Sequence, residues 1–319
     1  MSSRKQFIVS HAPFWHDGSS VPERNYHFLL ALLPAVLMGV ANFGVPALAV
    51  ICLSVASAIG WEVAFNYAGK RPVTVADGHA AVIGLLLAMV FPATAPWWLV
   101  LLGTLVAIVI GKQIYGGIGS NPVHPVALAW AILYVAYKPF FDFDGMLANF
   151  RFDFPALYPL GALKAFGPEA IAKFSLTDLF LGHQIGGLGA TCGWALILGG
   201  LYLILRNFVR WEIAFSFLGG VFVTALLFHL GDPTRYAGPW FHLFTGYTLI
   251  GAFFLVPEDS SSPVNFAPML IYGALAGFMV VLIRNIGDFS DGTMFAILFS
   301  NVINPLVDKI RPKALGKVA

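Results

Sequence analysis

Acidic residues in or beside apolar stretches are the first candidates for chemistry in this sequence. Because charge is costly in the core of a bilayer, an acid at that depth is a candidate for binding or passing an ion. The candidates are Glu62, Asp77, Glu258, Asp259, Asp291 and Asp308. Asp77 and Asp291 each precede a glycine at a predicted helix start, where an acid can instead cap the helix. Glu62 lies deepest, and there an ion or proton role and a pairing with Lys or His from another helix both stay open.

The hydroxyl of Thr191 is a second candidate, in the stretch "IGGLGATCGWALILGG" from Ile185 to Gly200. Gly-Ala-Thr at the start of a membrane helix can look like a site where a flavin is attached through its phosphate. The alternative is a helix entrance built from small residues. The Gly-rich stretch "GKQIYGGIGSNPVHP", Gly111 to Pro125, can bring backbone donors close to a phosphate or a flavin ring, or can form a tight re-entrant turn. It matches no nucleotide-binding fingerprint.

Histidines near segment ends do not predict a metal site. No two of them have the spacing of a metal-binding pair on one helix face. They are His79, His124, His229 and His242. The two cysteines, Cys52 and Cys192, exclude a disulfide framework or a four-thiolate metal site within the chain.

The composition indicates that lipid surrounds the elements that position these candidates. The 319 residues are 58% hydrophobic and only 11% charged, whereas soluble domains usually have about 25% charged residues. The net charge of +2 gives no argument for nucleic-acid binding. The first residues, "MSSRKQFIVSHAPFWHDG", have no long apolar core before a cleavage site, so a signal peptide is not expected.

The apolar pattern predicts an all-α polytopic membrane protein with about ten transmembrane helices, some of them broken. A bilayer core of roughly 30 Å needs about 20 helical residues, and fewer where helices are broken. The predicted segments are 26–43, 46–67, 78–92, 96–111, 122–137, 192–208, 211–230, 239–256, 267–284 and 290–308. Polar residues with Gly or Pro open the third and fifth, and Asn304-Pro305 interrupts the tenth. Broken backbone at membrane depth is tolerated only against protein or a wet cavity, so these breaks point to a site.

One long connection divides the ten segments into five and five. The predicted organisation is an N-terminal cytoplasmic segment 1–25, a first membrane repeat 26–137, an extracytoplasmic loop 138–191, a second repeat 192–308 and a cytoplasmic tail 309–319. The loop is too polar to span and too long for an ordinary link, so we expect it to be functional or partly folded. Asn121-Pro122 and Asn304-Pro305 fall at matching places, which hints at an internal duplication.

The distribution of Lys and Arg predicts that both termini are cytoplasmic. With the N-terminus inside, twelve of the 18 lysines and arginines lie on the inner side. Four of the six on the outer side lie in the long loop, where positive charge carries less weight for orientation.

Four blocks of the sequence, in this order, resemble the NqrB/RnfD family, whose members are RnfD of the Rnf complex and NqrB of sodium-translocating NADH:quinone reductase. The blocks are "VADGHAAVIGLLLAMVFPATAPWW", "GKQIYGGIGSNPVHP", "IGGLGATCGWALILGGLYLI" and "IRNIGDFSDGTMFAILFSNVINPLVD". The resemblance runs from about Tyr26 to Pro312. It implies two inverted five-helix repeats, as in urea channels. It also implies an integral subunit of a complex in the cell (inner) membrane that couples electron transfer between ferredoxin and NAD to movement of Na⁺ or H⁺.

The resemblance also bears on flavin attachment. Family members usually attach FMN to the threonine of an S-G-A-T motif in the long loop. The best match here is "LGAL", Leu160 to Leu163, and Leu163 has no hydroxyl to form a phosphoester. The block around Thr191 matches a different family motif, G-S-I-G-E-T-S. Covalent FMN is therefore not expected, on Thr191 or elsewhere.

Two departures from the family pattern mark further candidates. His124 stands where N-P-x-N-P has an amide, and Glu258 stands at the acid of a T-D-P motif. Some relatives hold a second flavin non-covalently near these loops, which makes Asn121 and His124 candidates for binding FMN or riboflavin. The resemblance suggests Asp77, Glu258 and Asp308 for cation handling, although local structural roles remain open for each.

The sequence leaves three functions open. The first is a membrane subunit of an ion-translocating oxidoreductase complex, working with other Rnf-type subunits rather than as a stand-alone enzyme. The missing flavin threonine leaves room for the second, a small-solute channel or carrier on the same scaffold. The third is a structural anchor for redox partner subunits.

Overall fold

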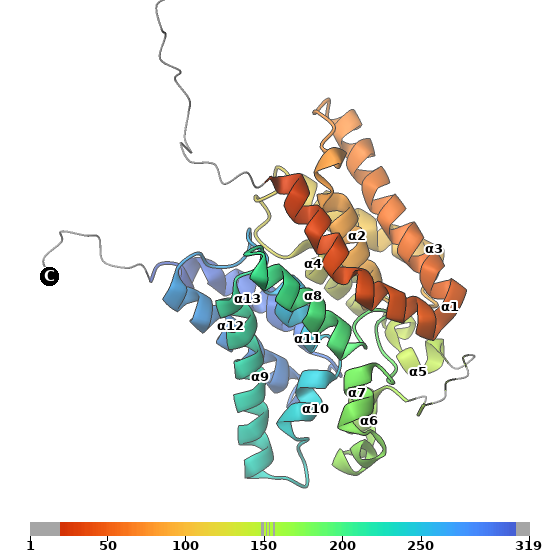
Figure 1. Ribbon diagram of the computed structural model, residues 1–319, viewed down its shortest axis with the longest axis vertical. Coiled ribbons are helices and arrows are strands. Elements are labelled where there is room, and N and C mark those ends of the chain that lie inside the picture. Colours follow the sequence, from red (N-terminus) through yellow and green to blue (C-terminus); the bar gives the residue numbers. More distant parts are fainter. Residues whose placement is uncertain (1–19, 148–149, 151, 153, 156, 311–319) are drawn as a thin grey trace, which may run out of the picture.

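The protein is a bundle of helices, several of them short or broken (Figure 1). The computed structural model describes residues 20–310 except 148–149, 151, 153 and 156. All regular secondary structure within these residues is helical. Most of the N-terminal segment 1–25 and of the tail 309–319 lies outside the described residues.

The first predicted segments, 26–43 and 46–67, form one sharply bent helix, α1 (Val21–Ala68). The bend is at Gly44, whose φ of 67° and ψ of −148° only glycine adopts readily, and Pro46 follows it. The two arms of α1 lie as a V in Figure 1. The predicted division between the two segments is therefore in the right place, although no loop separates them.

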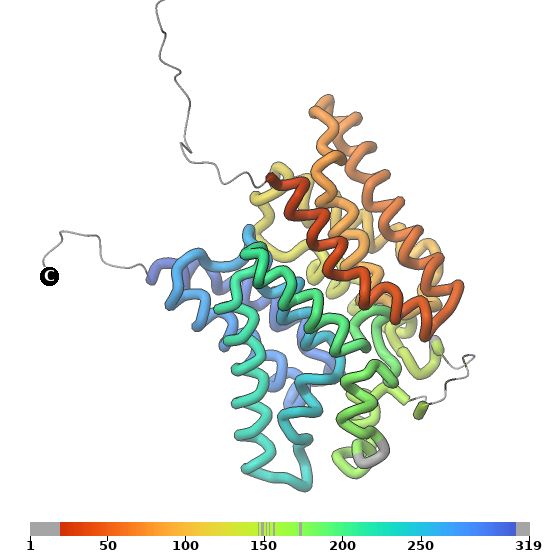
Figure 2. The backbone as a smooth tube through the Cα atoms, in the orientation of Figure 1, coloured from red at the N-terminus to blue at the C-terminus, as the bar shows by residue number. Residues whose placement is uncertain are grey.

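The remaining helices of the first half are short and overlap the two arms of α1 in the view of Figure 2. They are α2 (His79–Val90), α3 (Trp97–Leu105), which continues as a π-helical stretch Val106–Gln113, and α4 (Pro125–Ala136). α2 begins after Gly78, whose φ is 73°, and the Asp77 carboxylate accepts a hydrogen bond from the His79 amide at 2.8 Å. The polar openings predicted for the third and fifth segments are thus helix starts.

The second half contains a break that the sequence pattern did not reveal. Its helices are α8 (Gly193–Leu205), α9 (Trp211–Gly231), α10 (Pro239–Phe244), α11 (Thr248–Ile250), a π-helical turn Gly251–Leu255, α12 (Phe266–Asn285) and α13 (Thr293–Val307). The predicted segment 239–256 is interrupted at Gly246, which has a φ of 64°. By contrast, α13 continues through Pro305 to Val307, so Asn304-Pro305 lies in the last helical turn and does not break the helix internally.

The long connection 138–191 is partly folded, as one of the two predicted alternatives required. It contains short helical pieces at Lys138–Phe141, Phe143–Met146 (α5), Pro159–Phe166 (α6), Pro168–Lys173 and Leu176–Leu181 (α7). Its last residues are buried and close the end of α2. The amides of Gly189 and Leu188 donate to the carbonyls of Met89 and Phe91, so this irregular backbone is satisfied inside the protein.

The described helices fit a membrane location. By length and composition, three of those described can cross a bilayer: α1, α9 and α12. Five shorter apolar helices of 10–17 residues accompany them. Large apolar side chains on the outside of these helices are exposed, as expected for surfaces that contact lipid.

Glycines allow α9 and α12 to pack closely. A Cβ atom on Gly277 would lie 2.7 Å from the backbone nitrogen of Val221, and one on Gly273 would meet backbone atoms of Ile213 and Phe217. Gly273 and Gly277 are four residues apart and share one face of α12. This is the small-residue spacing that brings membrane helices into backbone contact.

Substituting Gly277 with alanine is expected to destabilise the protein by about 1–3 kcal/mol, because the added methyl group forces α9 and α12 apart. Gly219 on α9 is the matched control, since a Cβ there meets nothing within 4 Å. Gly219→Ala is expected to be neutral or slightly stabilising, as alanine is the better helix former. Unfolding of both variants in detergent micelles measures the difference. Equal stability of the two variants would contradict the proposed contact.

Candidate functional site

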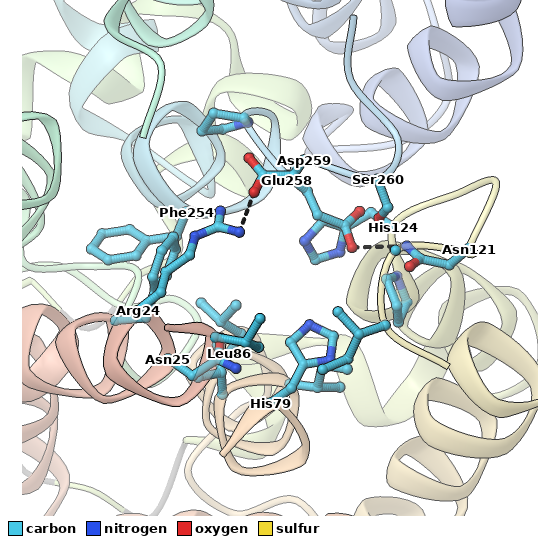
Figure 3. Close-up of a pocket in the computed structure, with 18 residues that line it drawn as sticks. Arg24, Asn25, His79, Leu86, Asn121, His124, Phe254, Glu258, Asp259 and Ser260 are labelled. Carbon is cyan, nitrogen blue, oxygen red and sulfur yellow. Dashed lines mark hydrogen bonds and ion pairs between the residues drawn. The ribbon is translucent and has the colours of Figure 1, made fainter. Parts of the chain in front are cut away.

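A cavity of about 300 Å³ lies where the start of α1, the start of α2, the Gly-rich loop and the residues after the π-turn Gly251–Leu255 meet (Figure 3). We call it the histidine cavity, because His79 and His124 both line it. Its apolar wall is formed by Phe28, Val82, Ile83, Leu86 and Phe254. The volume is at the lower end of the range for small-molecule sites.

The structure brings together three predicted site residues in this cavity: Asn121, His124 and Glu258. The Asn121 side-chain amide donates to Glu258 Oε1 at 2.8 Å and to the carbonyl of Val123 at 3.1 Å. Its own oxygen, Oδ1, is buried and has no hydrogen-bond partner among the described residues. An acceptor is therefore left available for a ligand.

The imidazole of His124 caps α4. Its Nδ1 accepts a hydrogen bond from the Val126 amide at 3.2 Å, and its backbone amide donates to Asn301 Oδ1 at 2.9 Å. Because Nδ1 accepts, the proton of the neutral ring is on Nε2. His124 thus offers the cavity a hydrogen-bond donor, whereas Asn121 offers an acceptor.

Two charged residues at the rim connect opposite sides of the histidine cavity. Arg24 of α1 forms an ion pair with Asp259, which follows Glu258 (Figure 3). Both side chains are partly exposed, so the pair itself is worth little in stability. With Glu258 and Asp259 against Arg24, the fixed charges around the cavity sum to about −1 while the histidines are neutral.

These residues fit the ring system of a flavin. A flavin ring is apolar on its faces and carries an N–H donor and carbonyl acceptors along one edge. Phe28 and Phe254, whose rings pack edge to face with centroids 6.5 Å apart, can contact one face. The unpaired Asn121 oxygen and the His124 N–H can pair with the edge.

A second cavity, of about 480 Å³, lies on the other side of the Gly-rich loop. We call it the lysine cavity, because Lys112 lines it. It is also lined by Asn66, Arg71, Pro72, Thr74, Asp77, Gln113, Gly116, Gly117 and Ile118. The exposed side chains of Arg71 and Ile118 show that it reaches the protein surface.

A buried ion pair forms the floor of the lysine cavity. Lys112 Nζ donates to both oxygens of Glu62, at 2.9 and 3.0 Å, and the two side chains are 1% and 0% exposed. Thr74 Oγ1 and Gln113 Nε2 donate to Glu62 Oε1 at 2.6 and 3.1 Å. Of the two roles left open for Glu62, the pairing with a lysine from another helix is therefore present.

The turn Asp77–Gly78–His79 separates the two cavities. Asp77 lines the lysine cavity and His79 lines the histidine cavity. Partial burial raises the pKa of Asp77 above its usual value, although the hydrogen bond from the His79 amide opposes this shift. Ile118 lines both cavities, so the Gly-rich loop is their common wall.

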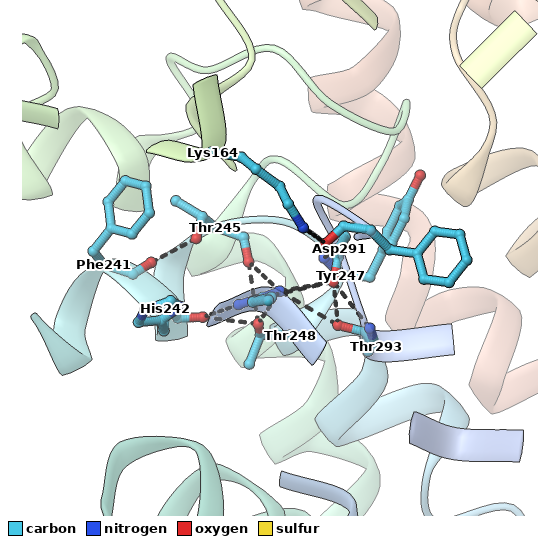
Figure 4. Close-up of polar contacts among 10 residues, drawn as sticks. Lys164, Phe241, His242, Thr245, Tyr247, Thr248, Asp291 and Thr293 are labelled. Carbon is cyan, nitrogen blue, oxygen red and sulfur yellow. Dashed lines mark hydrogen bonds and ion pairs between the residues drawn. The ribbon is translucent and has the colours of Figure 1, made fainter. Parts of the chain in front are cut away.

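A third polar cluster lies in the second half, around the break at Gly246 (Figure 4). Arg284 at the end of α12 and Asp291 before α13 form an ion pair of 3.0 Å, and both side chains are buried. The Arg284 guanidinium also donates to the carbonyls of His242 and Thr245, at 2.8 and 3.2 Å. Asp291 accepts from the amides of Tyr247 and Thr293, at 2.7 and 3.0 Å. The cluster therefore binds the broken segment to the start of α13.

Two residues considered for covalent flavin attachment lie away from both cavities. Thr191 is 4% exposed at the entrance to α8, and its hydroxyl has no partner within the described part of the chain. Leu163 lies on α6 in the long connection and packs against the core. Neither residue lines a cavity described above.

The three candidates for cation handling are not gathered in one place. Glu258 lies in the histidine cavity and Asp77 in the lysine cavity. Asp308 lies past the end of α13 and accepts a long hydrogen bond, 3.4 Å, from the amide of Val264. Among the residues described, no group of three His, Cys, Asp or Glu side chains could hold a metal ion.

Sequence reasoning missed Lys112 and Arg24 as members of the sites. Both were counted only as charges that set orientation. Lys112 is the second residue of the Gly-rich stretch, at the end of an apolar run, and this position could have marked it as the partner of Glu62. No local signal connects Arg24 with Asp259, because 235 positions separate them along the chain.

Comparison with known proteins places the chain among membrane subunits. Residues 8–316 match the family described as NQR2, RnfD, RnfE. The RnfD subunit of the ion-translocating oxidoreductase complex of Klebsiella pneumoniae (strain 342) is 32% identical, with 97% of this chain and 99% of that protein covered. The proteins of the same name from Stutzerimonas stutzeri and Escherichia coli (strain K12 / DH10B) are 35% and 31% identical. The similarity to the Stutzerimonas stutzeri protein covers 94% of this chain and 94% of that protein. The similarity to the Escherichia coli protein covers 97% of this chain and 98% of that protein.

Proposed function

Because this chain belongs to the NQR2, RnfD, RnfE family, we propose that it is the membrane subunit of an Rnf-type complex that couples electron transfer to ion translocation. The similarity over nearly the whole chain to subunits of ion-translocating oxidoreductase complexes carries this proposal. Its partners are the other subunits of that complex. The electrons pass between ferredoxin and NAD, and the translocated ion is Na⁺ or H⁺.

The membrane topology that goes with this function is ten crossings in two inverted five-helix repeats. Two correspondences between the halves support it. A glycine with positive φ precedes a short helix in each half, at Gly78 and at Gly246. A buried basic residue is paired with an acid in each half, Lys112 with Glu62 and Arg284 with Asp291. The domain limits proposed are those predicted above, with 138–191 as the extracytoplasmic loop.

The proposed orientation in the cell inner membrane has both termini in the cytoplasm. Both cavities then lie near the cytoplasmic side, where Arg24 and Arg71 are found. Tags placed at either end are expected to be accessible only from the cytoplasmic side. Labelling of a terminal tag in intact cells by a reagent that cannot cross the membrane would contradict this orientation.

The histidine cavity is the proposed site for a non-covalent flavin, FMN or riboflavin. Asn121 and His124 would hold the polar edge, and a bound flavin would supply one-electron chemistry at this place. The unpaired Asn121 oxygen supports the proposal, because a buried acceptor without a partner costs about 1–3 kcal/mol. The excess of acidic charge around the cavity favours riboflavin over the phosphorylated FMN.

Ions are proposed to be handled at Asp77, Glu258 and Asp308, with the lysine cavity as the entry chamber. Charge entering the histidine cavity acts on Glu258 and, through the turn at Gly78, on Asp77. The coupling is therefore conformational: a change of charge in one cavity shifts the affinity for an ion in the other.

Purification of the complex, with flavin analysis of each subunit and ion transport in vesicles, tests the function. Denaturation is expected to release a flavin from this subunit, and the intact complex should take up ions when electrons are supplied. Ion or solute flux through the isolated chain without redox partners would indicate a channel or carrier instead. Assembly of a pumping complex in which this chain holds no flavin would leave it the role of an anchor.

A further inference from the structure

The lysine cavity offers a ligand one positive and one negative group. Lys112 and Glu62 neutralise each other in its floor, where both side chains are almost completely buried. The other two charged residues that line the cavity are Arg71 and Asp77. Their charges cancel, so the cavity as a whole favours neither a simple anion nor a simple cation.

Arg71 lies at the mouth of the lysine cavity, and its side chain is exposed. The guanidinium donates to the carbonyl of Gln113 at 3.5 Å and lies over the ring of Phe65, 5.7 Å from the ring centroid. These contacts hold the side chain at the mouth but leave most of its N–H groups without a partner in the described part of the chain. Such a guanidinium can bind a phosphate through parallel hydrogen bonds. The preceding residue, Lys70, is also exposed and adds positive charge at this place.

Asp77 is more buried than Arg71 and lies in the turn before α2. One of its carboxylate oxygens, Oδ1, accepts a hydrogen bond from the His79 amide at 2.8 Å. The other oxygen, Oδ2, has no hydrogen-bond partner among the described residues. A primary ammonium group suits this oxygen, because it carries a positive charge and several N–H donors.

Large apolar side chains near the mouth are exposed. Ile118 lines the cavity and is 42% exposed. Val73 and Tyr115, each next to a lining residue in the sequence, are 61% and 46% exposed. In the proposed orientation they lie on the cytoplasmic side, where tyrosine and basic residues occur at the level of the lipid headgroups. An amphipathic ligand therefore fits, with its polar part in the cavity and its apolar part over these side chains.

We propose that the lysine cavity binds the headgroup of a phosphatidylethanolamine molecule from the cytoplasmic leaflet. The phosphate pairs with Arg71 at the mouth, and the ammonium group reaches Asp77 further inside. The acyl chains remain in the bilayer, next to Ile118 and the exposed side chains beside it. The cavity volume of about 480 Å³ lies within the range of small-molecule sites.

Asp77 selects among lipid headgroups. Phosphatidylglycerol brings a negative charge toward this carboxylate and has no ammonium group to compensate for it. Phosphatidylcholine has a positive group, but its trimethylammonium has no N–H to donate. Phosphatidylethanolamine therefore binds more tightly than either.

Asp77 is also proposed above to handle the translocated ion. The ammonium group of the lipid and that ion compete for one carboxylate, so the headgroup serves as the counter-charge of Asp77 while no ion is bound. This competition rests on the proposed function. Binding of the lipid itself requires neither electron transfer nor a flavin.

Lipid binding to the purified complex tests the proposal. The complex is stripped of lipid with detergent and titrated with micelles that contain phosphatidylethanolamine, phosphatidylcholine or phosphatidylglycerol, and bound lipid is counted by native mass spectrometry. A single phosphatidylethanolamine for each copy of this chain is expected to bind about tenfold more tightly than the other two lipids, the effect of one charge-assisted hydrogen bond. Equal affinity for all three lipids would indicate an unselective lipid layer and would overturn the proposal. Free phosphoethanolamine that binds as tightly as the lipid would also overturn it, because the ligand would then be a soluble molecule.

Two variants with matched controls locate the site. Arg71→Gln and Asp77→Asn are each expected to weaken phosphatidylethanolamine binding about tenfold, and Asp77→Asn should also remove the discrimination against phosphatidylglycerol. Arg210→Gln and Asp308→Asn make the same changes of charge outside the cavity and should bind the lipid as the wild type does. Undiminished affinity in Arg71→Gln or Asp77→Asn, or an equal loss in the controls, would overturn the proposal. A complex that retains this lipid but moves no ions would contradict the proposed function and leave the lipid site intact.

A second measurement needs no variant. Phosphatidylethanolamine with a photoreactive diazirine near its glycerol is incorporated into vesicles that hold the complex. Illumination should label residues 67–73 and 114–118 in preference to other parts of the chain. Labels spread evenly over the lipid-facing sides of α1, α9 and α12 would overturn the proposal.

Discussion

Replacing Glu62 with glutamine is expected to destabilise the protein by roughly 3–5 kcal/mol, because it leaves the ammonium of Lys112 buried without a counter-charge. Both partners are almost completely buried, and both Glu62 oxygens accept hydrogen bonds from Lys112. The double variant Glu62→Gln, Lys112→Met removes both charges. It should recover most of the loss, since a buried pair replaced as a unit is often close to neutral.

Unfolding of the single and double variants in detergent micelles gives this comparison, and a double-mutant cycle isolates the pairwise energy. Thr74→Val is a useful control, because it removes one hydrogen bond to the Glu62 carboxylate but keeps both charges, so it should cost only about 1.5–3 kcal/mol. A loss below about 1 kcal/mol in Glu62→Gln would mean that water from the lysine cavity reaches and solvates Lys112. The pair would then be hydrated through the cavity that Lys112 lines.

Replacing Asn121 with leucine is expected to reduce the non-covalent flavin content of the complex by at least tenfold. The substitution removes the free acceptor of the histidine cavity and also leaves Glu258 Oε1 without its amide donor. The loss of one buried hydrogen bond to a ligand, about 1–3 kcal/mol, corresponds to a roughly fivefold to 150-fold weaker affinity, and the unpaired Glu258 oxygen adds to this loss.

Asn66→Leu is the matched control for this experiment. Asn66 is the same residue type, equally buried at 2% exposure, and lines the lysine cavity instead. Flavin released from equal amounts of assembled complex is measured for both variants. If both variants lose flavin alike, the effect comes from the fold, and the histidine cavity is not the binding site.

The sequence predicted the helical class and most helix positions, because long apolar runs between Gly, Pro and polar residues determine them. It also indicated the division at Gly44–Pro46, since both residues disturb a helix. The sequence did not predict the interruption at Gly246, because "FTGYTLIGAFF" is as apolar as an unbroken helix. What holds that break open is the side chain of Arg284, which lies 38 positions further along the chain.

The site was predicted only in part, because local sequence patterns reveal some of its residues but not the contacts between distant ones. Asn121 and His124 were found because they interrupt an apolar pattern beside a Gly-rich loop. Glu258 is 137 positions from Asn121 along the chain. It lies in the same cavity only because of how the two halves pack, and no local sequence pattern predicts that packing. His79 was noticed only as a poor metal ligand. Its position at the border of two cavities depends on the turn at Gly78.

The wall formed by Ile118 has a practical consequence. The side chain of Ile118 borders both cavities, so a bulky molecule bound against it in the lysine cavity would intrude on the space of the proposed flavin. By reciprocity, an occupant of either chamber lowers the affinity of the other by the same factor. Compounds selected for the lysine cavity would thus act as remote antagonists of the proposed flavin, without competing for the groups proposed to hold its ring.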